Sequence, residues 1–194
     1  GDVIAYSGLQ PGDTVVITGA GQVAQLALIA AKAGGAGRVV MGGVTSDRTL
    51  RFPAALALGA DAVVDSNTED LSALVMKLTD GRGADLAIEA SGSEAGINNA
   101  ISCLRTGGRL TVLGLTRRDS VAVQWDTALR KMLTVRYHMM SNYRLMDRSI
   151  EIFATYPRDL SPLVTHTMPL EEWKRLFDIL SQGGGIKGVM KIIP

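Results

Sequence analysis

The chain has 194 residues, of which 46% are hydrophobic and 20% are charged, and its formal net charge at pH 7 is +1. This balance is typical of a globular domain with a sizeable core, and it lacks the basic surplus that nucleic-acid binding requires. No apolar run is long enough to span a membrane, and the N-terminal residues lack the features of a signal peptide. The single cysteine, Cys103, leaves no intrachain disulfide and no CxxC zinc site. We therefore expect a cytoplasmic protein whose partners are neither membranes nor nucleic acids.

A glycine turn joins the first expected strand to the first expected helix. The β-forming run Thr14–Thr18 stops at Gly19, and the hexapeptide GAGQVA then opens an alanine-rich helix that ends near Ala33. This is the G-x-G-x-x-G/A pattern in the strand–turn–helix context that dinucleotide binding needs. Gly19 permits the tight turn, and Gly21 has no Cβ, so a pyrophosphate can approach the free N–H groups at the helix start. An ordinary βα turn has the same pattern, so the motif alone leaves both interpretations open.

Strand-like and helix-like segments continue to alternate as far as residue 140, which predicts βαβ crossovers and a parallel sheet. The strands show little alternation of apolar and polar residues, as expected when helices cover both faces of the sheet. The further strands that we expect are Arg38–Met41, Ala62–Asp65, Asp85–Glu89, Arg109–Leu113 and Leu133–Met139. The helices expected between them are Pro53–Leu58, Asp70–Thr79 and a segment from Ser93 to about Leu104.

Glycines collect immediately after four of these strands. In a parallel sheet the carboxyl ends of the strands lie at one edge, and ligands bind in the crevice beside it. Glycine at four strand ends favours one long crevice that holds a ligand close to the backbone. These glycines are Gly19 and Gly21, Gly42 and Gly43, Gly92, and Gly114.

The pattern changes after Met140. We expect a helix over Tyr143–Tyr156, a short strand over Leu163–Thr167, a helix from Pro169 to about Gln182, and a closing strand over Lys187–Ile193. The predicted division is a dinucleotide-binding domain over residues 1–156 and a C-terminal segment over residues 157–194.

As an ordered set, the motifs resemble the cofactor half of a medium-chain dehydrogenase/reductase. They are similar to the zinc-dependent branch that includes threonine and sorbitol dehydrogenases. Besides the glycine turn, the resemblance rests on Pro11-Gly12-Asp13-Thr14-Val15, Leu58-Gly59-Ala60-Asp61, Gly81-Arg82-Gly83-Ala84-Asp85, Glu89-Ala90-Ser91-Gly92, Gly107-Gly108-Arg109-Leu110, Val112-Leu113-Gly114-Leu115, Ser161-Pro162-Leu163-Val164-Thr165-His166 and Pro169-Leu170-Glu171-Glu172-Trp173.

This resemblance implies an α/β fold: a doubly wound Rossmann sheet of six parallel strands with helices on both faces, followed by a segment that returns to a catalytic domain. It implies hydride transfer between NAD or NADP and an alcohol or carbonyl, with zinc only in the full-length parent. The Gly-His-Glu metal motif and the four-cysteine lobe of that family are absent from these 194 residues. We therefore expect a fragment that binds cofactor without turnover, and we assign it no catalytic and no metal-binding residue.

The resemblance also implies contacts along the cofactor. The backbone at Gly21, Gln22 and Val23 would meet the pyrophosphate, and Gly92 would lie beside the adenosine. Leu113 and Gly114 would border the nicotinamide, and His138 to Met140 would offer backbone to its carboxamide. Lys187 would reach the pyrophosphate, or would be a solvated lysine at a strand end.

The end of the second strand departs from the family. Where the family usually has an aspartate for the ribose hydroxyls of NAD, this chain has Gly43. Asp47 could reach back to the ribose, which would preserve NAD binding. Alternatively, Thr45, Ser46 and Arg48 could bind the 2′-phosphate of NADP. The sequence leaves these two alternatives open.

Two other functions and one partner are compatible with the sequence. A zinc-free, quinone-reductase-like member of the same superfamily and an S-adenosylmethionine-binding methyltransferase are the alternative functions. By resemblance, a homodimer would form through the edge strand at residues 133–139, with Leu133, Val135, Tyr137 and Met139 on one face. The isolated titratable side chains have structural interpretations: a core thiol at Cys103, a carboxylate with satisfied hydrogen bonds at Glu89, a buried edge residue at His138 and a strand residue at His166.

Overall fold

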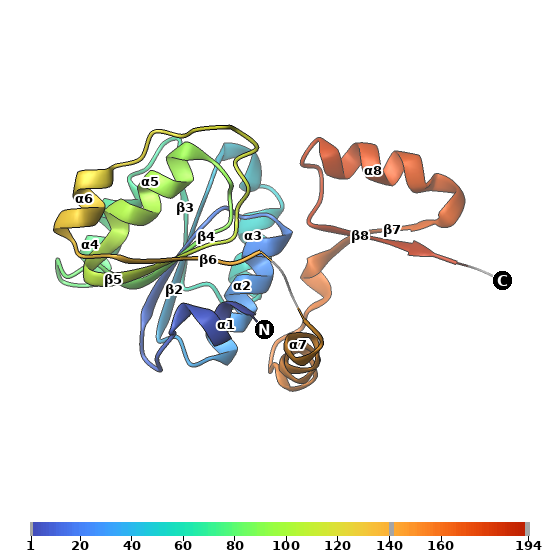
Figure 1. Cartoon of the computed structure of the whole chain (residues 1–194). Helices are drawn as coiled ribbons and strands as arrows, with labels where there is room; N and C mark the ends of the chain where they lie inside the picture. Colours follow the sequence, from blue (N-terminus) through green and yellow to red (C-terminus); the bar gives the residue numbers. More distant parts are fainter. Residues whose placement is uncertain (1, 140–141, 193–194) are drawn as a thin grey trace.

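The computed structural model describes residues 2–139 and 142–192, and its main feature is a sheet of six parallel strands (Figure 1). The strand order is β3-β2-β1-β4-β5-β6, and every neighbouring pair is parallel. This order reverses direction between β1 and β4, as in doubly wound dinucleotide-binding folds. The strands are β1 (Thr14–Thr18), β2 (Arg38–Gly43), β3 (Ala62–Asp65), β4 (Ala84–Glu89), β5 (Leu104–Val112) and β6 (Thr134–Tyr137).

Helices cover both faces of this sheet (Figure 1). On one face, Val15 and Ile17 of β1 belong to a buried cluster with Leu28 of α2 and Ala55 of α3. On the other face, Val16 is buried in a cluster with residues of α4 and α5. The two-sided burial explains why the central strands lack alternating polar residues. The helices of this part are α1 (Asp2–Ser7), α2 (Gln22–Ala33), α3 (Arg51–Ala57), α4 (Leu71–Leu78), α5 (Glu94–Cys103) and α6 (Trp125–Arg130), with the 3-10 turn η1 (Thr45–Asp47).

The C-terminal part forms a second, smaller layer beside α2 and α3 (Figure 1). Strands β7 and β8 pair in parallel, and Leu163 and Ile186 join the buried cluster on the α2–α3 face. The Tyr156 hydroxyl donates to the carbonyl of Leu58 at 2.6 Å, which links the two parts. The elements are α7 (Tyr143–Thr155), η2 (Ser161–Leu163), β7 (Val164–Pro169), η3 (Leu170–Glu172), α8 (Trp173–Ser181) and β8 (Lys187–Lys191). The division at residue 156 stays a prediction.

The predicted fold is confirmed, and the differences are local. Strand β5 begins at Leu104, five positions before the predicted start at Arg109, because Leu104 already pairs with Ala84 and the register shifts after it. Gly107, with φ of +69°, lies in this irregular stretch, so the glycine pair marks a bulge within the strand and not the strand's start.

Helix α6 was not predicted, because its six residues are too few to establish a helical period and none of them is buried. Helix α3 begins at Arg51, two residues before Pro53, and β6 is shorter than the predicted Leu133–Met139. Among the described residues, no helix is both long enough and apolar enough to cross a bilayer.

Candidate cofactor site

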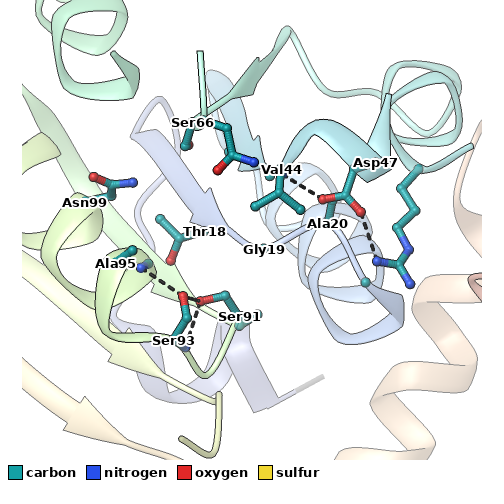
Figure 2. Close-up of a pocket in the computed structure, with 17 residues that line it drawn as sticks. Thr18, Gly19, Ala20, Val44, Asp47, Ser66, Ser91, Ser93, Ala95 and Asn99 are labelled. Atoms are coloured by element: carbon teal, nitrogen blue, oxygen red, sulfur yellow. Dashed lines mark hydrogen bonds and ion pairs between the residues drawn. The ribbon is translucent and has the colours of Figure 1, made fainter. Parts of the chain in front are cut away.

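A hollow of about 380 Å³ opens at the carboxyl ends of β1, β2 and β4 (Figure 2). Its position is the edge where doubly wound sheets bind ligands. The hollow is lined by Thr18, Gly19, Ala20, Gly21, Gly42, Gly43, Val44, Asp47, Arg51, Ser66, Asn67, Ala90, Ser91, Ser93, Ala95, Gly96 and Asn99.

The glycine turn has the two properties that the sequence predicted. Gly19 has φ of +103°, and a Cβ there would lie 2.9 Å from the backbone nitrogen of Ser91, so a side chain is excluded. Gly21 is different, since a Cβ built on it would meet nothing within 4 Å. The space beside Gly21 is therefore free for a ligand that approaches the backbone.

Gly21 is also the N-cap of α2, and no side chain accepts a hydrogen bond from the N–H groups of this helix start. Most helix starts are capped by a serine, threonine, aspartate or asparagine side chain, which satisfies one of the free N–H groups. Here the first turn, with Gln22 and Val23, presents uncapped N–H groups and the positive end of the helix dipole. This arrangement suits a pyrophosphate.

At the end of β2, Asp47 occupies the space that an aspartate at position 43 would need. A Cβ on Gly43 would lie 2.6 Å from the Asp47 carboxylate and 2.7 Å from the Phe52 ring. The Asp47 side chain is buried, accepts from the Val44 N–H at 2.8 Å and pairs with Arg51 at 2.9 Å. It thus brings a fixed carboxylate to the wall of the hollow from four residues further along the chain.

The residues predicted for a 2′-phosphate face elsewhere. The Arg48 guanidinium donates to Asp65 at 2.6 Å and to the Thr68 hydroxyl at 2.7 Å, and the Thr45 hydroxyl accepts from Asn67 at 3.3 Å. Thr45, Ser46 and Arg48 do not line the hollow. The geometry therefore favours the alternative with Asp47 over the alternative with Arg48.

Two polar atoms at the wall of the hollow have no hydrogen-bond partner in the described part of the chain. They are the hydroxyl oxygen of Thr18, which is 2% exposed, and Nε of Arg51. Buried polar groups are nearly always paired, so unpaired ones at a cavity wall fit a polar ligand. Arg51 also donates to the carbonyls of Gly183 and Gly185, both at 3.2 Å, and so connects the hollow to the C-terminal part.

Neither Gly92, which was predicted beside the adenosine, nor Leu113 and Gly114, which were predicted beside the nicotinamide, lines this hollow. Gly92, with φ of +63°, and Gly114 pack directly on each other, because a Cβ on Gly114 would clash with the Gly92 nitrogen. Leu113 donates its N–H to the Glu89 carbonyl at 2.8 Å and packs against the buried cluster. These glycines hold the turns after β4 and β5 together.

The remaining predicted contacts lie apart from the hollow. His138 is half-buried, and its ring stacks on that of Tyr6 at 5.1 Å between centroids. The backbone N–H of His138 donates to the Val112 carbonyl at 3.0 Å. Lys187 is exposed at the start of β8. Met140 lies outside the described residues.

The isolated titratable groups agree in part with their structural interpretations. Cys103 is fully buried, and burial raises the pKa of its thiol to about 12, so it is an inert core residue. One Glu89 oxygen accepts from the N–H groups of Ser91 and Gly92, but the other has no partner among the described residues, so the expectation of a satisfied carboxylate is wrong for that atom. His166 is half-buried in β7, with Nδ1 3.0 Å from the Thr165 hydroxyl.

Several lining residues were not predicted. Thr18 is the last residue of β1, and Ser66 and Asn67 directly follow β3, so their positions at strand ends were a usable signal. Asn99 lies within α5, and it lines the hollow because of the orientation in which that helix packs on the sheet. Across residues 2–139 and 142–192, no three His, Cys, Asp or Glu side chains are grouped so that they could hold a metal ion.

The strand order, the open glycine turn and the uncapped start of α2 together define a dinucleotide-binding domain of the Rossmann type. The profile of the zinc-binding dehydrogenase family matches residues 23–155. The chain belongs to the zinc-binding dehydrogenase family.

Individual relatives agree with this assignment. The chain is 29% identical over 95% of its length to a sorbitol dehydrogenase of Halalkalibacterium halodurans, of which it covers 53%. It is 30% identical over 97% of its length to D-arabitol-phosphate dehydrogenase of Enterococcus avium, of which it also covers 53%. The solved structure of an alcohol dehydrogenase from Thermus sp. superposes with a TM-score of 0.86 at 26% identity, over 98% of this chain and 54% of that one. The chain thus spans about half the length of the relatives that it matches.

Proposed function

We propose that this chain is the NAD(P)-binding domain of a zinc-type alcohol or polyol dehydrogenase, and that by itself it binds cofactor without turnover. The observation that carries the proposal is the pairing of an uncapped α2 start with free space at Gly21. The similar proteins include a sorbitol dehydrogenase and a D-arabitol-phosphate dehydrogenase, and these supply the substrate class. Titration of the purified chain with NAD by calorimetry tests the proposal, and an absence of binding would contradict it.

Different residues of the hollow would contact different parts of the cofactor. The first turn of α2 would hold the pyrophosphate, and Asp47 would accept from the ribose hydroxyls, positioned by its bonds to Val44 and Arg51. The bound nicotinamide would supply the hydride acceptor or donor. The described residues do not fit a zinc ion, so zinc ligands and the substrate pocket would come from other parts of the whole protein.

A zinc-free, quinone-reductase-like function and a methyltransferase function have no specific observation in their favour. The family match and the polyol and alcohol dehydrogenases among the relatives favour the first proposal over both. We further propose that the protein acts in the cytoplasm, on the basis of its low cysteine content.

We expect the chain to prefer NAD to NADP. The Asp47 carboxylate lines the hollow and would repel a 2′-phosphate, while Arg48 is held outside it by Asp65. Calorimetry should show a dissociation constant for NAD that is lower by about tenfold or more, the cost of one unfavourable charge contact. Asp47→Asn keeps an acceptor for the Val44 N–H but removes the charge, so it should reduce the difference between the dissociation constants for NAD and NADP. Tighter binding of NADP by the unaltered chain would contradict the assignment of Asp47.

We also propose that the chain forms a homodimer through β6. All four residues of this edge strand are exposed, and Val135 and Tyr137 place apolar side chains there. Sedimentation at micromolar concentration should show a dimer, and Val135→Lys should shift it to monomer. Ile150→Lys, which changes an exposed apolar residue on α7, is the control and should leave the dimer intact. A monomer for the unaltered chain, or equal effects of the two substitutions, would contradict pairing through β6.

A further inference from the structure

One wall of the hollow carries polar groups that the proposed contacts with pyrophosphate and ribose do not use. Figure 2 shows Asn99 and Ser66 near Thr18 on one side of the hollow, while Asp47 lies on the opposite side. The Thr18 hydroxyl is buried and without a partner, and Asn99 is half-buried. This wall therefore has unfilled hydrogen-bonding capacity.

The side chains of Asn98 and Asn99 differ sharply, although both belong to α5. The amide of Asn98 donates to the Ala122 carbonyl at 3.0 Å and accepts from the Gln124 N–H at 2.9 Å, so both its nitrogen and its oxygen are paired with the protein. The amide of Asn99 makes no hydrogen bond within the described part of the chain, and it lines the hollow. An asparagine amide can donate two hydrogen bonds and accept two, and a half-buried one without partners is poised for a ligand.

The order of groups along the hollow identifies the part of the ligand that would reach Asn99. The pyrophosphate would lie at Gly21, and the adjacent ribose at Gly43 and Asp47. The base is then the remaining group on that side, and it would extend toward the wall formed by Ser66 and Asn99. Ala95, on the same helix, also lines the hollow and offers a small apolar surface to the base.

We propose that Asn99 recognises the amino-bearing edge of adenine. Its amide oxygen accepts from the exocyclic amino group, and its amide nitrogen donates to the neighbouring ring nitrogen, the complementary pairing that asparagine makes with adenine. This inference rests on the proposed dinucleotide function. It makes Asn99 a specificity-determining residue for the base, separate from the choice between NAD and NADP at Asp47.

The test uses NAD and 1,N6-etheno-NAD, in which a bridge between N1 and N6 removes the N–H donors of the amino group and leaves N7 free. Calorimetry on the unaltered chain should give NAD an affinity about tenfold or more above that of the etheno analogue, because a polar site rejects a ligand that leaves its groups unpaired. Asn99→Ala should weaken the binding of NAD much more than that of the etheno analogue, which has already lost the contact to the amino group, so that most of the discrimination is lost. Because the Asn99 amide has no hydrogen-bond partner in the described part of the chain, the melting temperature of Asn99→Ala should stay close to that of the unaltered chain.

Asn98→Ala is the matched control: it removes the neighbouring amide and should retain the preference for NAD. Equal weakening of both ligands by Asn99→Ala, or full discrimination in that variant, would overturn the role of Asn99 while dinucleotide binding stands. Failure of both ligands to bind the unaltered, folded chain would overturn the proposed function and this inference together.

Discussion

Gly21→Asp is expected to abolish dinucleotide binding and, at the same time, to stabilise the fold. Gly21 is the N-cap of α2, its backbone is extended with φ of −71° and ψ of −175°, and a Cβ there would meet no atom within 4 Å. Aspartate is a preferred N-cap residue, and its carboxylate would accept from the N–H groups that are now uncapped. The helix should gain a few tenths of a kcal/mol, roughly 0.3, and the melting temperature should rise by about 1 °C.

The same carboxylate would take the hydrogen bonds and the space that we assign to the pyrophosphate. It would also place one negative charge against another in a partly enclosed site, so NAD affinity should fall by about 100-fold or more. Calorimetry gives the affinity and thermal unfolding gives the stability of the same sample. Gly21→Ala separates the two contributions, because it adds volume without charge and should weaken NAD by about tenfold.

Leu129→Asp adds a charge of the same sign on α6, at a residue that is 69% exposed and does not line the hollow. It should leave the affinity unchanged. Undiminished NAD binding by Gly21→Asp would remove the α2 start from the site, whereas unfolding of that variant would contradict the free space at position 21.

What the sequence could predict of this site depends on how far each residue's position is fixed by its own strand. The turn from Gly19 to Val23 follows β1 directly, so local pattern located it, together with the parallel order of the sheet. Asp47 and Arg48 are adjacent in sequence but turn in different directions, because Val44 and Asp65 each hold one of them. That choice depends on contacts between separate loops, and the sequence accordingly left it open.

The contribution of α5 to the site was not predictable from periodicity. Asn98 and Asn99 are the same residue type in adjacent positions, and only the docking of α5 on the sheet decides which of them faces the loop at 122–124 and which faces the hollow. The bulge in β5 was missed for a related reason. The pair Gly107-Gly108 is typical of a turn. In the structure, however, the ion pair between Arg105 and Asp85 at 2.7 Å holds β5 beside β4 before the irregular stretch, and the strand continues after it.

Asp85 shows that a charged motif residue of this chain can serve stability alone. The residue is 5% exposed, and its carboxylate accepts from the Thr14 N–H at 2.9 Å, from Arg82 at 2.6 Å and from Arg105 at 2.7 Å. Asp85→Ala would leave two guanidinium groups and a buried N–H without this acceptor. Because the two guanidinium groups are partly exposed to solvent, the main cost is the buried Thr14 N–H left without its acceptor, and the free energy of unfolding should fall by about 1–3 kcal/mol, as measured by urea denaturation at about pH 7.

The pH dependence gives an independent check on Asp85. Burial tends to raise the pKa of this carboxyl, but the hydrogen bonds from Arg82, Arg105 and the Thr14 N–H outweigh it and lower the pKa from 3.8 to about 2. A group with a lowered folded-state pKa contributes stability above its unfolded value, and that stability is lost as the pH falls through the folded value. About 2 kcal/mol should therefore disappear between pH 4 and pH 2 in the unaltered chain.

Asp85→Asn keeps the size of the side chain and one acceptor but cannot titrate, so this part of the acid sensitivity should be absent from it. Asp119→Asn, at an exposed loop position, is the control and should retain the acid sensitivity of the unaltered chain. Asp85 lies near the start of β4, at the opposite end of that strand from the hollow, so folded Asp85→Asn should bind NAD as the unaltered chain does. Substitutions at Gly21 and Asp85 would then have opposite outcomes: loss of binding with gained stability at one end of the sheet, and loss of stability with intact binding at the other. A variant of Asp85 with unchanged stability and an unchanged acid transition would contradict the structural role assigned to it.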